Sequence, residues 1–283
     1  MFFSPLEEPS MKMLSVHGIT LATEDRGAGS PLVLIHGFPL DHTMWEAQIE
    51  ALSGRWRVIA PDLRGFGRSG VTEGTVSMAR LADDVAALVE ALEIREPIVL
   101  CGLSMGGYVA LAFWRRHAKR LRGLILCDTR AAADSPEAAA ARRQTADRVL
   151  REGTGILADS MLPRLVAPQT LESRPHIAER LGATILACDP RGAAAAALGM
   201  AERPDFTDEL GGIRCPTLVL VGAGDVISPR EEMFSMAARI PACRFVSIEG
   251  SGHMTPMERP AEVNDAIAAF LTEIRGSGTA TGS

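Results

Sequence analysis

One serine stands in a setting that suits nucleophilic chemistry. Ser104 lies in the segment GLSMGG (102–107), which follows the apolar run PIVLC and precedes a helical stretch, 108–116. A sharp turn from strand to helix strains the serine backbone and needs small residues two positions before and after it. Gly102 and Gly106 meet that need. We predict that Ser104 is a nucleophile held above a sheet edge; the alternative is a serine that caps a glycine-rich turn.

A serine hydroxyl needs a neighbouring base, and one of the six histidines is placed for that role. His253 lies in the segment EGSGHM (249–254), between the last predicted strand and the last predicted helix. His17 falls in an opening hairpin, His117 ends a helix and His176 belongs to a helical insertion, which are positions typical of surface residues. We therefore predict that His253 is the general base.

The base in turn needs an anion that fixes its tautomer and stabilises the imidazolium ion. Asp225 follows the apolar run TLVLVG in the loop GAGD (222–225). Loop aspartates often only shape turns. The order Ser, Asp, His along the chain is, however, the order expected with a strand-turn-helix nucleophile. We predict Asp225 as the acid, with Asp128 at the end of the run LILC as the competing candidate.

Two backbone N–H groups are expected to stabilise the oxyanion of a tetrahedral intermediate. One belongs to Met105, and the other to Phe38 in the loop HGFP (36–39). His36 is interpreted as a hydrogen-bonding residue beneath this loop. The sequence shows no cluster of His, Asp or Cys with metal-ligand spacing, so we expect neither a metal nor an organic cofactor.

A glycine-rich segment, PDLRGFGRS (61–69), invites a phosphate-binding interpretation. It lacks both the Lys-Thr ending of a P-loop and the G-x-G-x-x-G pattern of a dinucleotide site, so we expect a structural turn with an Arg and Asp network. The net charge is −6, and no face concentrates basic residues. We therefore expect no nucleic-acid partner.

Short apolar runs alternate with amphipathic stretches, which predicts an α/β fold. Several runs are apolar at consecutive positions, as in strands buried on both faces of a parallel sheet. These runs are 32–35, 58–60, 98–101, 124–127, 218–221 and 245–248. A hairpin over 14–16 and 19–22, turning at a His-Gly pair, adds an antiparallel edge. The predicted fold is a mostly parallel eight-stranded sheet flanked by helices.

The alternation stops between about 129 and 205, where Ala-, Arg- and Glu-rich segments contain no strand-like run. Helices are expected at 136–152, 155–165, 174–188 and 193–201. An insertion between two strands lies over the sheet edge where ligands bind, so we interpret it as a lid. The predicted domains are an α/β core (1–129 and 206–275), a helical lid (130–205) and a flexible tail (276–283).

The lid is expected to contribute side chains to an apolar substrate pocket. The predicted pocket residues are Met161, Leu162 and Leu165, with Trp45 and Phe38 below them. Arg130, Arg142 and Arg143 near the lid could meet an acid group, although solvated arginines are the simpler account.

Composition and the chain start favour a cytoplasmic protein. The chain is 47% hydrophobic but contains no run near the roughly 18 apolar residues of a membrane span. Its start lacks a basic segment followed by a long apolar stretch, as an export signal would have. The five cysteines are scattered without C-x-x-C spacing, which is typical of free thiols in a reducing compartment. We expect no membrane partner.

Taken together, HGFP, DLRGFGRS, GLSMGG, GAGD and GSGH resemble the signature set of the α/β-hydrolase superfamily, over residues 16–271. The resemblance implies that fold with a triad of Ser104, Asp225 and His253, and oxyanion donors at Phe38 and Met105. Haloalkane dehalogenases and epoxide hydrolases of this superfamily carry aspartate at the nucleophile position. Serine there implies acyl chemistry.

Within the serine branch, GLSMGGYVAL and the stretch at 203–205 resemble 3-oxoadipate enol-lactonase-like proteins and small carboxylesterases. The resemblance implies hydrolysis of a small-molecule ester or lactone through an acyl-enzyme. Two alternatives share the SMGG segment: cofactor-free perhydrolases and carbon–carbon bond hydrolases of ring-cleavage products. A ligand receptor with a slow or single-turnover triad is the alternative from another class. The sequence does not indicate an oligomeric state.

Overall fold

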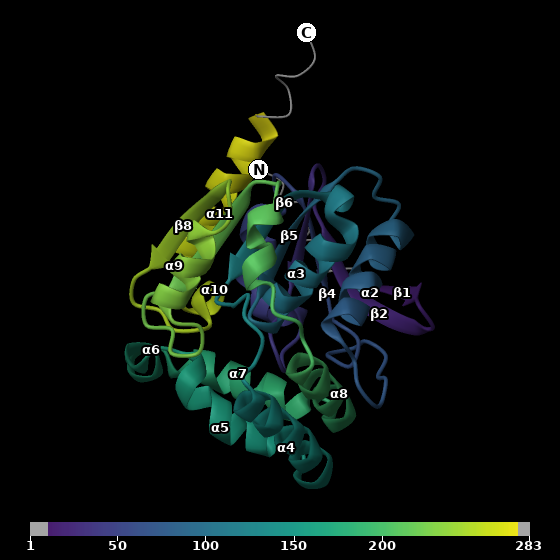
Figure 1. The fold of residues 1–283 in the computed structure, drawn as a ribbon, viewed down its shortest axis with the longest axis vertical. Coiled ribbons are helices and arrows are strands. Elements are labelled where there is room, and N and C mark those ends of the chain that lie inside the picture. The colour runs from purple at the N-terminus through teal and green to yellow at the C-terminus, as the bar shows by residue number, and fades with distance from the viewer. Residues whose placement is uncertain (1–10, 277–283) are drawn as a thin grey trace, which may run out of the picture.

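The chain forms one eight-stranded sheet with helices on both faces (Figure 1). The computed structural model describes residues 11–276. The strand order is β1-β2-β4-β3-β5-β6-β7-β8, and all neighbours from β4 to β8 pair in parallel, while β1 with β2 and β2 with β4 pair antiparallel. The strands are β1 Lys12–Val16, β2 Ile19–Arg26, β3 Pro31–Ile35, β4 Arg57–Pro61, β5 Ile98–Leu103, β6 Leu121–Cys127, β7 Thr217–Gly222 and β8 Cys243–Ile248. The predicted mostly parallel sheet with an antiparallel edge is confirmed.

The burial of the strands explains why their sequences are continuously apolar. Every residue of β3, β5 and β7 is buried, because helices cover both faces of the sheet there. The two edge strands differ: β1 and β8 contain exposed and half-buried residues. The centre of the sheet therefore carries the apolar core, and its carboxyl edge carries the polar loops.

Helices of the core pack in pairs on the two faces. Helix α2 (Met78–Ala91) lies beside α3 (Met105–His117), and α1 (Glu46–Leu52) lies beside α11 (Pro260–Gly276). The Ser77 hydroxyl accepts a hydrogen bond from the amide of Arg80 and so caps α2. Two shorter helices follow β7 and β8: α9 (Arg230–Ala238) and α10 (Thr255–Glu258).

Five α-helices and a short 3-10 helix (Thr207–Gly212) separate β6 from β7, and Figure 1 shows the five α-helices gathered at one end of the sheet. They are α4 Pro136–Glu152, α5 Gly155–Leu165, α6 Pro168–Ser173, α7 Pro175–Ala187 and α8 Pro190–Ala201. Helix α4 packs on α8, and α5 packs on α7. Helix α6 was not predicted, because six residues between two prolines are too few to show a helical period. We call residues 130–205 the helical insertion; its role as a lid stays a prediction.

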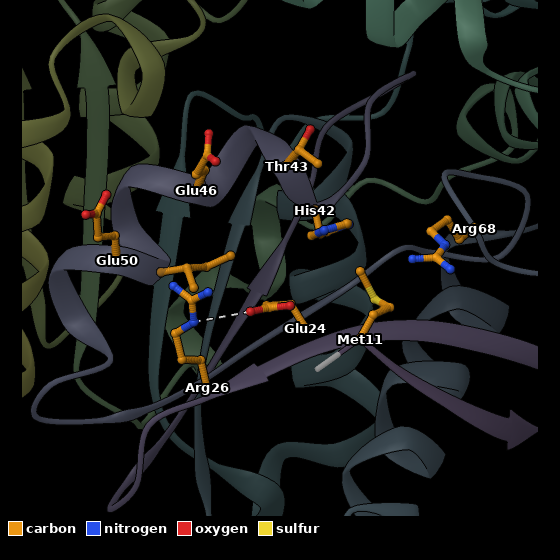
Figure 2. Close-up of a pocket in the computed structure, with 9 residues that line it drawn as sticks. Met11, Glu24, Arg26, His42, Thr43, Glu46, Glu50 and Arg68 are labelled. Carbon is orange, nitrogen blue, oxygen red and sulfur yellow. Dashed lines mark ion pairs between the residues drawn. The ribbon is translucent and has the colours of Figure 1, made fainter. Parts of the chain in front are cut away.

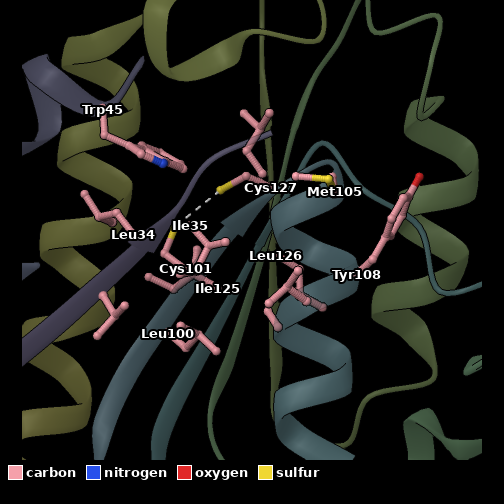
Figure 3. Packing of buried hydrophobic residues seen from close by; sticks show 14 of the residues in the cluster. Leu34, Ile35, Trp45, Leu100, Cys101, Met105, Tyr108, Ile125, Leu126 and Cys127 are labelled. Atoms are coloured by element: carbon pink, nitrogen blue, oxygen red, sulfur yellow. Dashed lines mark hydrogen bonds between the residues drawn. The ribbon is translucent and has the colours of Figure 1, made fainter. Parts of the chain in front are cut away.

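The main apolar cluster extends through the whole core, and Figure 3 shows its part around β3, β5, β6 and α3. Leu34, Leu100 and Ile125 are fully buried in it. The Sγ atoms of Cys101 and Cys127 lie 3.8 Å apart in this cluster. The hydrogen bond with Cys101, together with burial, raises the pKa of the Cys127 thiol well above its usual range. Both thiols therefore behave as small apolar core groups.

Within residues 11–276, no helix combines the length and the apolarity needed to cross a bilayer. Residues 1–10, which form most of the chain start where no export signal is expected, lie outside the described residues. So does most of the predicted flexible tail, since α11 ends at residue 276 and the description stops there.

Candidate active site

Ser104 forms a strained turn between β5 and α3. Its φ is 54° and its ψ is −113°, in a region that side-chain-bearing residues rarely adopt. Leu103 and Met105 on either side are buried, whereas Ser104 itself is partly exposed. Its hydroxyl makes no capping hydrogen bond to α3. The capping alternative is therefore not realised, and the hydroxyl is free for chemistry.

The glycines around Ser104 allow the turn to pack tightly against β3. A Cβ atom on Gly102 would lie 2.1 Å from the carbonyl oxygen of Gly106, and one on Gly106 would lie 2.3 Å from the carbonyl oxygen of Ile35. The Thr129 hydroxyl donates a hydrogen bond of 2.7 Å to the carbonyl oxygen of Ser104. Close backbone approach and this bond hold the strained serine in place.

Gly106→Ala should destabilise the protein, because the added methyl group would overlap backbone atoms of β3. We expect the free energy of unfolding to fall by about 1–3 kcal/mol, as for other overpacked sites. Gly54→Ala is the matched control, since a Cβ atom there meets no atom within 4 Å. Chemical denaturation followed by circular dichroism measures both. Equal stabilities of the two variants would show that the turn does not need a glycine.

His253 and Asp225 form a buried pair beside the ends of β7 and β8. The distance from His253 Nδ1 to Asp225 Oδ2 is 2.8 Å, and both residues are at most 5% exposed. Asp225 Oδ1 accepts hydrogen bonds from the amides of Ile227 and Ser228, at 2.7 and 3.1 Å. A carboxylate fixed in this way favours the Nδ1–H tautomer. Nε2, which has no hydrogen-bond partner among the described residues, is then left to accept a proton.

Asp128, the competing acid, has a different environment. Its Oδ1 accepts hydrogen bonds from the amide of Gly222, at 2.8 Å, and from the hydroxyl of Thr255, at 3.0 Å. Its Oδ2 is buried without a partner in the described part of the chain. Burial, together with the negative charge of Asp225, raises the pKa of Asp128 well above its usual range. Asp128 therefore suits a neutral structural role, in which it connects the end of β6 to Gly222 and Thr255. Asp225, in contrast, forms the hydrogen bond with His253.

The two predicted oxyanion donors belong to segments next to Ser104. Met105 begins α3, where first-turn N–H groups have no helical acceptor. Phe38 belongs to the loop after β3, and a Cβ atom on neighbouring Gly37 would lie 3.5 Å from Ser104 Cβ. Within residues 11–276, neither the Met105 nor the Phe38 amide donates to a protein acceptor. Both amides are thus available to a ligand oxygen.

His36 supports the Phe38 loop from below. Its Nδ1 lies 3.0 Å from the carbonyl oxygen of Gly37, and its Nε2 accepts a hydrogen bond of 2.9 Å from the amide of Leu63. Burial lowers the pKa of His36, in agreement with a neutral ring that donates through Nδ1 and accepts through Nε2. This bonding leaves no free nitrogen for a second base.

A cavity of about 530 Å³ lies between the core and the helical insertion. The core contributes Phe38, Tyr108 and Ile227, which are near neighbours in sequence of Gly37, Ser104 and Asp225. The remaining lining residues are Arg130, Asp134, Ala138, Ala141, Arg142, Thr145, Leu157, Ser160, Met161, Arg164, Ala197, Val226, Pro229 and Glu232. A small organic molecule fits a cavity of this size.

The cavity wall carries an excess of positive charge. Arg142 pairs with Asp134 at 2.5 Å, and Arg130 pairs with Glu232 at 3.2 Å. Arg164 forms no ion pair with any residue in the described range 11–276. Three arginines therefore face two acidic residues, and the Arg164 guanidinium group is the one left without a carboxylate.

Comparison with known proteins decides the family. A family model described as the alpha/beta hydrolase family matches residues 32–266, which include the Phe38 loop, the Ser104 turn and the His253 loop. The chain belongs to the alpha/beta hydrolase family. The predicted superfamily and fold are thereby confirmed.

Relatives of this hydrolase-family chain include esterases and lactonases. A thermophilic esterase from Thermogutta terrifontis, whose structure has malate bound, is 54% identical with a TM-score of 0.90, covering 93% of this chain and 97% of that chain. An enol-lactonase from Burkholderia xenovorans LB400 is 30% identical with a TM-score of 0.86, covering 92% and 100%. A 3-oxoadipate enol-lactonase from Acinetobacter baylyi is 27% identical, covering 94% and 98%.

The predicted pocket residues of the hydrolase fare differently in the structure. Phe38 and Met161 line the cavity. Trp45 does not: it is fully buried in the apolar cluster of Figure 3. Leu165 is also buried, and its carbonyl oxygen accepts a hydrogen bond from the amide of Met254, whereas half-buried Leu162 lies outside the lining. Trp45, Leu162 and Leu165 therefore do not line this cavity.

Tyr108, Arg164 and Asp134 are among the lining residues that were not predicted from the sequence. Tyr108 and Arg164 lie on helices, four residues after Ser104 and three after Met161. The three-residue spacing places Arg164 on the same face of α5 as Met161, and Tyr108 lies in the first turn of the helix that follows Ser104. These spacings are the signal that could have found them. Asp134 gives no such signal, because its partner Arg203 is 69 positions away and approaches only in the fold, at 2.9 Å.

A second cavity, of about 360 Å³, lies between β2 and the segment that leads into α1 (Figure 2). Its wall includes Glu24 and Arg26, which pair at 3.3 Å, as well as His42. Ligand atoms of Asp41, His42 and Asp62 lie within 4.8 Å of one another, a grouping that sequence spacing did not reveal.

The hydrogen bonds of Asp62 explain that grouping. Its Oδ1 accepts from the amide and from Nδ1 of His42, at 2.9 and 2.6 Å, and its Oδ2 accepts from the amide of Arg68, at 2.8 Å. Arg64 in the same segment pairs with Asp84 at 2.6 Å. The segment 61–69 is therefore a turn built on Asp and Arg contacts, as its sequence predicts.

Proposed function

We propose that this member of the alpha/beta hydrolase family is a serine hydrolase that cleaves an ester or lactone bond of a small molecule through an acyl-enzyme. The buried hydrogen bond between His253 Nδ1 and Asp225 Oδ2 carries this proposal. It leaves Nε2 free to take a proton, and the Ser104 hydroxyl at the same sheet edge has no structural task.

In this mechanism His253 takes the Ser104 proton as the serine oxygen attacks the substrate carbonyl carbon. The amides of Phe38 and Met105 donate to the resulting oxyanion. His253 then gives its proton to the leaving oxygen, the carbon–oxygen bond breaks and an acyl-enzyme remains. Water, deprotonated by His253, attacks the acyl carbon and restores the Ser104 hydroxyl as the acid leaves.

Two relatives agree with ester or lactone chemistry. The 54% identical Thermogutta terrifontis protein is an esterase, and the Burkholderia xenovorans protein is an enol-lactonase. Both match this chain over more than nine tenths of its length, which takes in most of the helical insertion that covers the cavity. Their activities support an acyl substrate small enough for a cavity of about 530 Å³.

The test combines turnover with covalent labelling. The protein is offered p-nitrophenyl esters of rising acyl length and small lactones, and is separately treated with a fluorophosphonate probe. Repeated turnover, with the label mapped by mass spectrometry to Ser104, is the expected result. Labelling with no turnover on any ester or lactone would favour a receptor or a carbon–carbon bond hydrolase. A protein that is never labelled would overturn the proposed nucleophile.

The charge of the cavity predicts a preference for acyl groups that end in a carboxylate. Arg164 has no carboxylate partner within residues 11–276, so an anionic acyl end can pair with it. The presence of malate, a dicarboxylate, in the Thermogutta terrifontis structure agrees with this expectation. We expect Arg164→Gln to lower kcat/KM for p-nitrophenyl hemiglutarate about two- to fivefold, the range of an exposed ion pair.

The neutral ester p-nitrophenyl valerate, of the same length, should be unaffected by Arg164→Gln. Arg151→Gln serves as the matched control, because Arg151 lies on α4 outside the cavity and is 68% exposed. Parallel losses on the anionic and neutral esters would mean that Arg164 does not recognise charge.

A further inference from the structure

Glu258 is a fully buried acidic residue that the mechanism above does not use. It ends α10, five positions after His253, and is 0% exposed. Its Oε1 accepts a hydrogen bond of 2.8 Å from the amide of Gly252. Its Oε2 accepts from the amide of Ala167, at 2.8 Å, and from the hydroxyl of Thr170, at 2.7 Å. Both oxygens act only as acceptors, which is the bonding pattern of a carboxylate.

These hydrogen bonds fix the chain on one side of His253, and a second contact fixes the other side. The amide of Gly252, directly before His253, is bound by Glu258. The amide of Met254, directly after it, donates a hydrogen bond of 2.8 Å to the carbonyl oxygen of Leu165. The backbone of His253 is therefore held between two hydrogen bonds, and the acceptor of the second belongs to the helical insertion.

The same carboxylate also holds the junction of α5 and α6 in the insertion. A Cβ atom on Gly252 would lie 2.7 Å from the Ala167 nitrogen and 2.9 Å from the Val166 carbonyl carbon, so the histidine loop touches this junction directly. Arg174, at the end of α6, donates to the main-chain oxygen of Glu258 and, at 3.3 Å, to the hydroxyl of Thr170. One acidic side chain thus connects the histidine loop to the insertion.

We propose that Glu258 is a positioning residue for His253, and that it couples the placement of the helical insertion to the placement of the base. The proposal rests on the serine hydrolase function proposed above. If glutamine replaced Glu258, its NH₂ group would face either the Gly252 amide or the Ala167 and Thr170 donors, and it could not accept hydrogen bonds from them. The loop would then shift, and a displacement of about 1 Å in a reacting group costs about 100-fold in rate.

Glu258→Gln tests this role with little change in shape. The amide nitrogen of glutamine replaces one acceptor, so at least one of the three hydrogen bonds is lost. We expect kcat on the best p-nitrophenyl ester and the rate of fluorophosphonate labelling to fall together, by about 10- to 100-fold. KM should change by less than about threefold, because Glu258 does not line the cavity.

Thr170→Val is the matched control, since it removes the hydrogen bond from the Thr170 hydroxyl to Glu258 and keeps the bonds from the amides of Ala167 and Gly252. We expect kcat within about threefold of wild type, although a buried bond to a carboxylate is lost in this variant too. Hydrogen exchange at the amide of Gly252 should be faster in Glu258→Gln than in Thr170→Val. That difference in exchange rate measures the mobility of the histidine loop directly, without an assay of activity.

The outcomes separate this inference from the function on which it rests. If wild type is labelled and Glu258→Gln is labelled equally fast, Glu258 has no positioning role, and the serine hydrolase assignment stands. If both variants lose activity in proportion to their loss of stability, the role of Glu258 is structural only. If wild type is never labelled, both proposals fail.

Discussion

Ser104→Ala is expected to lower kcat for ester hydrolysis by at least about 10⁴-fold, the size of loss seen when a triad nucleophile is removed. Fluorophosphonate labelling should disappear in the same variant. The physical reason is that the hydroxyl oxygen forms the bond to the acyl carbon, and no neighbouring group can replace it. The residual rate would come from the Phe38 and Met105 amides and from substrate binding alone.

The fold should survive this substitution. The Ser104 hydroxyl makes no capping bond, so its removal leaves the hydrogen bonds of α3 intact. Alanine relieves none of the backbone strain at φ 54°, and we expect the thermal midpoint to stay within a few degrees of wild type. Ser235→Ala, at an exposed position of α9, should keep full activity. A Ser104→Ala enzyme with more than about one hundredth of wild-type kcat would show that the nucleophile lies elsewhere.

The sheet was predictable from the sequence because burial on both faces makes its strands apolar at every position. The runs at 98–101 and 218–221 fall inside β5 and β7. Gly102 and Gly106 indicated the position of the turn at Ser104. The proline at the start of α4 likewise indicated where that helix begins, whereas α8 begins at Pro190, three residues before the predicted start at 193. The apolar runs, the glycines and the proline of α4 are local features, so they can be found in the sequence alone.

The pocket was less predictable because its wall forms between segments that are distant in sequence. Trp45 has a large apolar side chain of the kind that lines pockets, but it packs fully into the core. In the sequence, Arg164 cannot be told from the other exposed arginines of the helical insertion. Only the structure places it at a cavity that has more arginines than acidic residues. Glu258 carries no local signal of burial, since its three donors belong to residues up to 91 positions away. Such properties follow from the packing of the insertion on the core.

The choice between Asp225 and Asp128 as the triad acid gives the second prediction of large effect. Asp225→Asn should lower kcat by about 10⁴-fold, because an amide can donate to His253 Nδ1 and so favour the wrong tautomer. Asp128→Asn should keep kcat within about threefold of wild type. Its Oδ1 bonds to Gly222 and Thr255 suit an amide oxygen equally well. The pair of variants, assayed on one ester, measures which carboxylate serves the base.

Stability against pH supplies an independent readout for Asp128. Since folding raises its pKa above the ordinary value of 3.8, the folded protein holds a proton that the unfolded chain releases. The free energy of unfolding therefore falls as the pH rises from about 4 towards the raised pKa. An asparagine side chain holds no such proton, so Asp128→Asn should gain stability relative to wild type as the pH rises above about 4. If Asp128→Asn instead loses both activity and stability at about pH 8 while Asp225→Asn keeps its activity, the acid of the triad is Asp128. The raised pKa of Asp128 argues against that outcome, because a protonated carboxyl group cannot stabilise an imidazolium ion by charge.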